Sequence, residues 1–171
     1  MNIKDIKIFA GNENIMRAYE ICMAGNFKMK LINSQDEDSA LSKIQFQKLS
    51  EYLAPAVTEN TNEAEILVEV VKPDITAILN SRRQETKEEV DARAKAVLDL
   101  TNFPERMQES SAALLKTAYN KLDFMPYEVK IIVQVAIIIA LLDNHKAETV
   151  DVNHIAEAIQ YRSLPKEFRE S

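Results

Sequence analysis

The side chains that could carry out chemistry are few and widely separated. The chain has two histidines, His145 and His154, and one cysteine, Cys22. A zinc site needs three or four ligands, which two histidines without a nearby cysteine do not supply. Cys22 falls on the apolar face of a predicted helix, where we expect a small buried hydrophobic residue rather than a nucleophile paired with a histidine. The sequence therefore predicts no metal site and no catalytic cysteine.

The acidic side chains are also expected to be solvated. Glu88 and Glu89 lie at an exposed helix end, and no serine stands in a glycine-framed or Ser/His/Asp arrangement. The acidic run at 36–38 favours the start of a helix, because negative charge stabilises that end, and bridging by a metal ion is the alternative. We therefore predict no catalytic residue, no cofactor-binding residue and no metal ligand, and the chain is not expected to be an enzyme.

Composition places these residues in a soluble protein. The chain has 171 residues, of which 46% are hydrophobic, and its net charge is −6. Such a surface repels phosphate backbones, and Arg82 and Arg83 form only an isolated basic pair, so nucleic-acid binding is not expected. The single cysteine and the lack of an apolar leader after Met1 predict a cytoplasmic protein. The longest apolar run, 131–142, is about half of what a membrane span needs, so no membrane contact is expected.

Hydrophobic periodicity predicts helices alternating with two short strands in the first half of the chain. Gly25 is expected to be the C-cap glycine of the first helix. Two strands alone make a marginal sheet, so they must pack on helices or pair with another chain. The expected ranges are helix 12–24, strand 28–32, helix 38–53, a polar connector at 56–63, strand 65–71 and helix 73–79.

The second half predicts four more helices. Thr86 followed by Glu89 is a capping-box signature, and Asp151 can cap the last helix. Pro126 fits the first turn of the most apolar helix, which must be covered on every side, at the centre of a bundle or at an interface. Pro165 is expected to stop this last helix from continuing soon after Leu164. The expected ranges are 86–98, 105–121, 126–143 and 151–164.

These elements predict a mainly α protein in two parts. Residues 1–80 are expected to form a small α/β unit of about two strands. Residues 81–171 are expected to form a helical bundle packed with it.

Two stretches of the sequence carry a resemblance to a known family. Residues 11–25 read GNENIMRAYEICMAG before an apolar strand, and 111–164 end in HIAEAIQYRSL. The first resembles the entry to the ATPase core of magnesium-chelatase-like AAA+ proteins, the ComM-type competence proteins in particular. The second resembles their C-terminal helical lid, and 86–98 is similar to the charged helix before it. The resemblance covers about half of the chain and implies a shortened AAA+ core joined to a lid.

The resemblance also identifies the nucleotide-binding residues that this chain lacks. A P-loop needs glycine-framed amides that cradle the phosphates, a lysine and a magnesium-binding hydroxyl. The family's loop falls on 33–40, which has neither glycine, Ser39 in place of the lysine and Ala40 in place of the hydroxyl residue. The acids at 36–38 would also repel a triphosphate.

Other parts of the family's machinery are expected to be missing. No apolar strand ends in Asp-Glu, and the segment 53–63 is too short to hold one, so the sensor and arginine-finger regions are expected to be deleted. Tyr127, Ile131 and Ile137 occupy positions where the family's lid helix carries arginines. Arg162 remains, and surface or bundle contacts are expected for it.

These features predict a non-catalytic protein, related to the competence and magnesium-chelatase proteins, that acts through protein–protein contacts. Its expected partner is another protein, such as an intact AAA+ relative that it regulates, or a second copy of itself. No cofactor is expected, and ATP binding is not expected. Two alternatives stay open: a nucleotide-binding AAA+ ATPase subunit with a divergent site, and an inactive relic.

Overall fold

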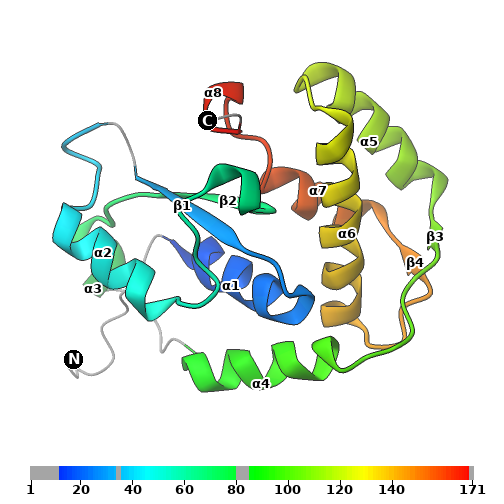
Figure 1. The fold of residues 1–171 in the computed structure, drawn as a ribbon, viewed down its shortest axis with the longest axis horizontal. Helices are drawn as coiled ribbons and strands as arrows, with labels where there is room; N and C mark the ends of the chain where they lie inside the picture. The colour runs from blue at the N-terminus through cyan, green and yellow to red at the C-terminus, as the bar shows by residue number, and fades with distance from the viewer. Residues whose placement is uncertain (1–11, 34–35, 80–84, 170–171) are drawn as a thin grey trace.

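The computed structural model describes residues 12–33, 36–79 and 85–169. The predictions that rest on Gly11, on Arg82 and Arg83, and on residues 34–35 lie outside these ranges. Within them the protein is mainly α, with two small two-stranded parallel sheets, which confirms the predicted fold class (Figure 1). Over the same ranges, no helix has the length and apolar character needed to cross a membrane.

Helices dominate both halves of the chain. The first half holds α1 (Glu13–Gly25), β1 (Met29–Asn33), α2 (Lys43–Tyr52), the 3-10 helix η2 (Thr61–Glu63), β2 (Ile66–Val70) and α3 (Ile75–Leu79). The second half holds α4 (Lys87–Leu98), β3 (Arg106–Met107), α5 (Glu109–Lys121), α6 (Pro126–Asp143), β4 (Thr149–Val150), α7 (Val152–Gln160) and α8 (Lys166–Arg169).

The start of α2 differs most from its predicted position. The prediction of a helix from residue 38 is wrong, because the helix begins only after Ser42. The Ser42 hydroxyl accepts a hydrogen bond from the Gln45 N–H, and the Gln45 side chain accepts one from the Ser42 N–H, which makes a capping box. The acids at 36–38 therefore belong to a separate turn and not to a helix start.

The end of α1 is also shifted from the prediction. Gly25 is the last helical residue, and Asn26 takes the left-handed conformation with φ of 54°. The Phe27 N–H then donates to the Cys22 carbonyl at 2.9 Å. Gly25 is needed for space, because a Cβ there would lie 2.3 Å from the Phe27 ring.

Two elements of the second half were not predicted. Arg106 and Met107 pair in parallel with Thr149 and Val150, so α5 begins at Glu109 and not near 105. Strands of two residues are too short to show the alternation that marks a strand in a sequence. The last long helix, α7, ends at Gln160, and the short α8 follows Pro165.

The two predicted strands pair with each other within the chain. β1 and β2 run parallel, in a register that places Met29 opposite Ile66 and Asn33 opposite Val70. The crossover between them contains α2 and η2. The sheet therefore needs no strand from a second chain to form, which settles a question that the sequence left open.

One hydrophobic core spans both predicted parts of the molecule. α1 contacts β2 and also packs on α4 and α6, and α6 in turn packs on α7 (Figure 1). The core runs without a break from Ile15 in α1 to Tyr161 after α7. The apolar helix α6 is central, with Ile132 and Ile139 at most 1% exposed, as predicted. The division at residue 80 stays a prediction, and the core crosses it.

Candidate functional site

The turn after β1, where the resemblance places a phosphate loop, is held by its own hydrogen bonds. The Asp36 carbonyl accepts from the N–H groups of Ser39 at 3.0 Å and Ala40 at 2.8 Å. The Asp36 carboxylate accepts from the Asp38 N–H at 3.1 Å. A phosphate cradle needs successive N–H groups that point at the ligand. In residues 38–40 those groups point back into the turn.

Two asparagine side chains close the carboxyl ends of the parallel strands. Asn33 bonds Leu41 twice, donating to its carbonyl at 2.9 Å and accepting from its N–H at 3.1 Å. Asn12 bonds Val71 in the same way, at 2.7 and 3.0 Å. Each side-chain amide thus uses a donor and an acceptor, as a neighbouring strand would. Ligands of open parallel sheets bind at this end, and here the chain's own polar groups occupy it.

A buried ionic cluster fixes the first turn of α6. Glu128 is 1% exposed and accepts hydrogen bonds from Arg162 at 3.1 Å and Arg169 at 2.9 Å. Arg162 also donates to the Ala64 carbonyl at 3.0 Å, which links the bundle to the segment before β2. The bundle contact predicted for Arg162 is confirmed, and the surface contact is wrong, because only 2% of the residue is exposed.

The second arginine of this cluster has further partners. Arg169 donates to the Leu122 carbonyl at 2.8 Å, and its guanidinium lies 4.9 Å from the centre of the Phe124 ring. Two cations face one carboxylate here. The Leu122 carbonyl and the face of the Phe124 ring stabilise the extra positive charge. We interpret the cluster as structural, because its carboxylate is fully engaged.

A second, more exposed ionic network also joins α1 to the bundle. Arg17 in α1 bonds Glu157 in α7 at 3.1 Å and Asp143 at 3.2 Å. Arg93 in α4 bonds Glu20 in α1 at 3.2 Å and also pairs with Glu85. The Arg93 hydrogen bond holds the pKa of Glu85 below its ordinary value. These pairs orient α1 against α4, α6 and α7.

His154, His145 and Cys22 lie in three different segments of the structure. His154 stands at the start of α7, where its Nδ1 accepts from the Asp151 N–H at 3.0 Å. His145 lies in the loop after α6, and Cys22 is 1% exposed in α1. The burial predicted for Cys22 is confirmed, and that burial raises the pKa of its thiol. Within 12–33, 36–79 and 85–169, no group of His, Cys, Asp and Glu could hold a metal ion.

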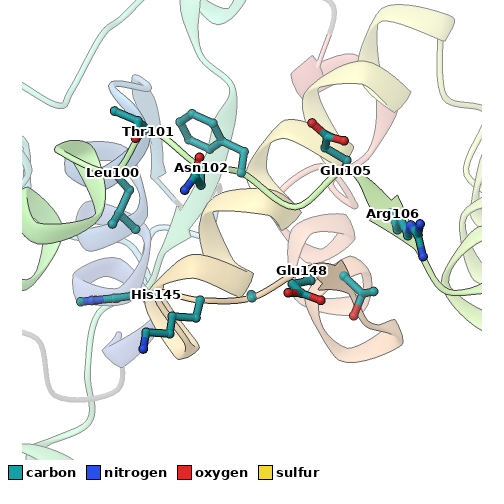
Figure 2. Close-up of a pocket in the computed structure, with 11 residues that line it drawn as sticks. Leu100, Thr101, Asn102, Glu105, Arg106, His145 and Glu148 are labelled. Carbon is teal, nitrogen blue, oxygen red and sulfur yellow. The ribbon is translucent and has the colours of Figure 1, made fainter.

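One hollow in the described surface lies between two loops. It has a volume of about 820 Å³ and is lined by residues from 100–106 and 145–149. Figure 2 shows His145 and Arg106 at opposite ends of this hollow, with their side chains pointing away from each other. A catalytic site needs its acid, base and nucleophile to converge on one point. We therefore do not assign this hollow an activity.

A smaller groove between α5 and α6 is more informative. Its volume is about 540 Å³, and its α5 wall follows a helical stripe with spacings of three and four residues. We call it the α5–α6 groove. Its lining residues are Met107, Ala112, Leu115, Lys116, Tyr119, Asn120, Pro126 and Val129.

The α5–α6 groove is apolar and open to solvent. Lys116 is the one charged residue among the described residues that line it. Tyr119 is 39% exposed, and Met125 and Tyr127 at the start of α6 are 41% and 50% exposed. Exposed apolar side chains gathered in one place mark a contact surface more often than chance exposure does.

Two polar anchors hold the walls of this groove in place. The Glu128 cluster fixes the turn of α6 that carries Pro126 and Val129. The buried Ser111 hydroxyl donates to the Val150 carbonyl at 3.0 Å and fixes the start of α5. The sequence did not identify the groove, although α5 has more apolar residues than one buried face requires.

Comparisons with known proteins found no matching family model, no matching curated protein and no matching solved structure. The resemblance to magnesium-chelatase-like proteins therefore stays a prediction, as do the roles drawn from it. The groove and the two ionic clusters depend on the geometry of the described residues and not on that resemblance.

Proposed function

We propose that this chain is a non-catalytic protein that acts through protein–protein contacts, and that the α5–α6 groove is the surface that makes them. The observation that carries this proposal is the open, apolar stripe of α5 beside the fixed first turn of α6. A second helix packs on such a stripe by fitting its ridges between the side chains. The expected partner is a protein that presents an amphipathic helix.

The closed strand ends support the non-catalytic half of the proposal. The amides of residues 38–40 are bonded to Asp36, and Asn12 and Asn33 fill the carboxyl edge of the sheet. Binding a triphosphate there would first require these bonds to break. The acids Asp36 and Asp38 would then repel it.

The proposal also includes two expected partners. An intact AAA+ relative that this chain regulates is the first expectation from the resemblance, and a second copy of the chain is the other. A cytoplasmic location belongs to the same proposal, since one buried cysteine suits a reducing compartment.

Affinity capture with matched variants tests the proposal. Wild type, Tyr119→Glu and Phe103→Ser are used as baits in extracts of the source cell, since Phe103 is a similarly exposed aromatic residue outside the groove. We expect a protein retained by wild type and Phe103→Ser and lost with Tyr119→Glu. Capture that is equal with all three baits contradicts the role of the groove. Light scattering on the same variants identifies a second copy as the partner.

A thermal shift with ATP and magnesium tests the alternative ATPase function. Saturation at about 100 times Kd would stabilise the fold by about 2.7 kcal/mol. We expect no shift at millimolar ATP. A shift that Asp36→Asn increases would replace the proposal by a divergent nucleotide site.

A further inference from the structure

The outer edge of β1 is a second surface, separate from the α5–α6 groove. On this edge the Met29 N–H donates to the Ala56 carbonyl at 2.8 Å, and the Met29 carbonyl accepts from the Thr58 N–H at 2.9 Å. The bridge between Met29 and Val57 is parallel. The segment 56–58 thus begins a third strand beside β1 but covers only one residue of it.

Strand geometry shows which residue on this edge of β1 has main-chain groups that segment 56–58 does not bond. The Ile66 N–H donates to the Lys28 carbonyl at 3.2 Å, so Lys30 and Ile32 direct their main-chain groups toward β2. Leu31 therefore directs its N–H and carbonyl to the same side as Met29. After Thr58 the chain turns away, with the Asn60 N–H bonded to the Thr58 hydroxyl at 3.2 Å. No main-chain partner for Leu31 stands on that side among the described residues.

A groove lies where the third strand stops. Its volume is about 560 Å³, and it lies between β1, α2 and the segment 54–59. Leu31, Phe46 and Val57 give it an apolar wall. An extended segment placed here can bond the Leu31 main chain and put alternate side chains against that wall.

Charge determines which extended segment fits. Glu51 and Glu59 line the groove with Lys30, whose ammonium donates to the Thr61 hydroxyl at 2.7 Å, so acids outnumber cations two to one among the described lining residues. Glu51 accepts a hydrogen bond from the Gln47 side chain at 3.1 Å. The groove therefore favours lysine or arginine on the residues that alternate with the apolar ones.

We propose that the outer edge of β1 binds an extended peptide of another protein, in which apolar residues alternate with lysine or arginine, as an added strand continuing the line of residues 56–58. Main-chain hydrogen bonds to Leu31 supply binding that depends little on sequence, and the acids select the charge. This site lies beyond the function proposed above and uses none of the residues of the α5–α6 groove.

Synthetic peptides test the added strand. The probe is a fluorescent Val-Lys-Val-Lys-Val peptide, and the matched controls are a copy methylated on alternate backbone nitrogens and a copy with Asp in place of Lys. Fluorescence anisotropy is expected to show binding of the first peptide, and at least about tenfold weaker binding of both controls. Equal binding of the methylated copy overturns the added strand, and absence of binding at millimolar peptide overturns the site.

Protein variants locate the binding on this edge. Glu51→Gln combined with Glu59→Gln is expected to weaken the peptide by about tenfold, since it removes the two acids and leaves the main chain in place. Tyr119→Glu is expected to bind the peptide as wild type does, so failure of this proposal is separable from failure of the proposed function. Slower hydrogen exchange of the Leu31 amide on peptide addition is the direct readout, and an unchanged rate contradicts the proposal.

Discussion

Two clusters of charge connect distant segments of this chain with bonds of almost equal length. The Arg162–Glu128 pair measures 3.1 Å and the Arg93–Glu20 pair 3.2 Å. Their surroundings differ, since the side chains of the first pair are 2% and 1% exposed and those of the second are 45% and 10% exposed. A buried charge that loses its partner cannot be rehydrated, whereas an exposed one returns to water. Burial therefore decides what each pair contributes.

The buried cluster also bears on function, because it lies beneath the α5–α6 groove. Glu128 is in the first turn of α6, between the groove residues Pro126 and Val129. The exposed network lies between α1 and the helices α4 and α7. Damage to the buried cluster is therefore expected to alter the groove, and damage to the exposed network is not.

The largest expected effect comes from removing the buried carboxylate. Glu128→Gln leaves Arg162 and Arg169 buried without an anion, and we expect it to lower the free energy of unfolding by about 3–5 kcal/mol. Urea denaturation followed by circular dichroism measures the change. The double variant Glu128→Leu with Arg162→Met is the control, and we expect it to recover part of the loss. A loss below about 1 kcal/mol for Glu128→Gln would place this cluster with the exposed pairs.

Removal of the uncharged Asn33 side chain is expected to cost less stability than removal of Glu128 and more than removal of Arg93. Asn33→Ala removes both hydrogen bonds to Leu41 and leaves its main-chain groups without their partner, so we expect a loss of about 1–3 kcal/mol. Asn102→Ala, at an exposed loop position, is the control and should be nearly neutral. The same denaturation series measures both variants. A neutral Asn33→Ala would mean that water replaces the side chain.

The exposed network should matter least to stability at neutral pH. Arg93→Ala is expected to cost less than about 1 kcal/mol, since Arg93 is 45% exposed and the buried Glu20 keeps a second cation, Arg17, at 3.9 Å. Arg93 lowers the pKa of Glu85 in the folded state, so this contribution is present above the ordinary Glu pKa of 4.5 and is lost as pH falls through the folded-state pKa. Stability measured from pH 7 to pH 3 should therefore fall less steeply in Arg93→Ala than in wild type. Parallel curves would contradict the assignment.

The smallest expected effect is a difference in the rate at which Cys22 is alkylated when the buried cluster or the exposed network is damaged. The thiol is buried and burial raises its pKa, so reaction with iodoacetamide at pH 7.5 requires the core to open. We expect slow labelling in wild type and Arg93→Ala, and faster labelling in Glu128→Gln. Mass spectrometry over time gives the three rates. Equal rates in all three proteins would show that Cys22 is reached without the opening of the core that Glu128 stabilises.

Local patterns predicted the elements better than the contacts between them. The capping box of Thr86 and Glu89, the strand at β2 and the apolar helix α6 are each written in a few adjacent residues, and the structure confirms them. The turn at 36–38 was placed wrongly, because three acids suit a helix start and Ser42 suits it better. Here two local signals competed, and the one with a reciprocal side-chain bond prevailed.

The polar closures could not be predicted, because their partners are far apart in the sequence. Arg162 meets Glu128 across 34 residues and Ala64 across 98. Asn12 and Val71 are 59 residues apart. Helical and strand periodicity indicate which face of an element is buried. They do not indicate which arginine will be buried beside Glu128 as its ion-pair partner. The groove was missed for a related reason, since its two walls come from different helices.

The bond between Arg17 and Glu157 joins residues 140 positions apart. Glu157 therefore follows Arg17 by 140 residues during synthesis. At about 5–20 residues per second, Arg17 is made roughly 7–28 s before Glu157. The ion pair between α1 and α7 can therefore form only after β2 and α4, on which α1 packs, have been made.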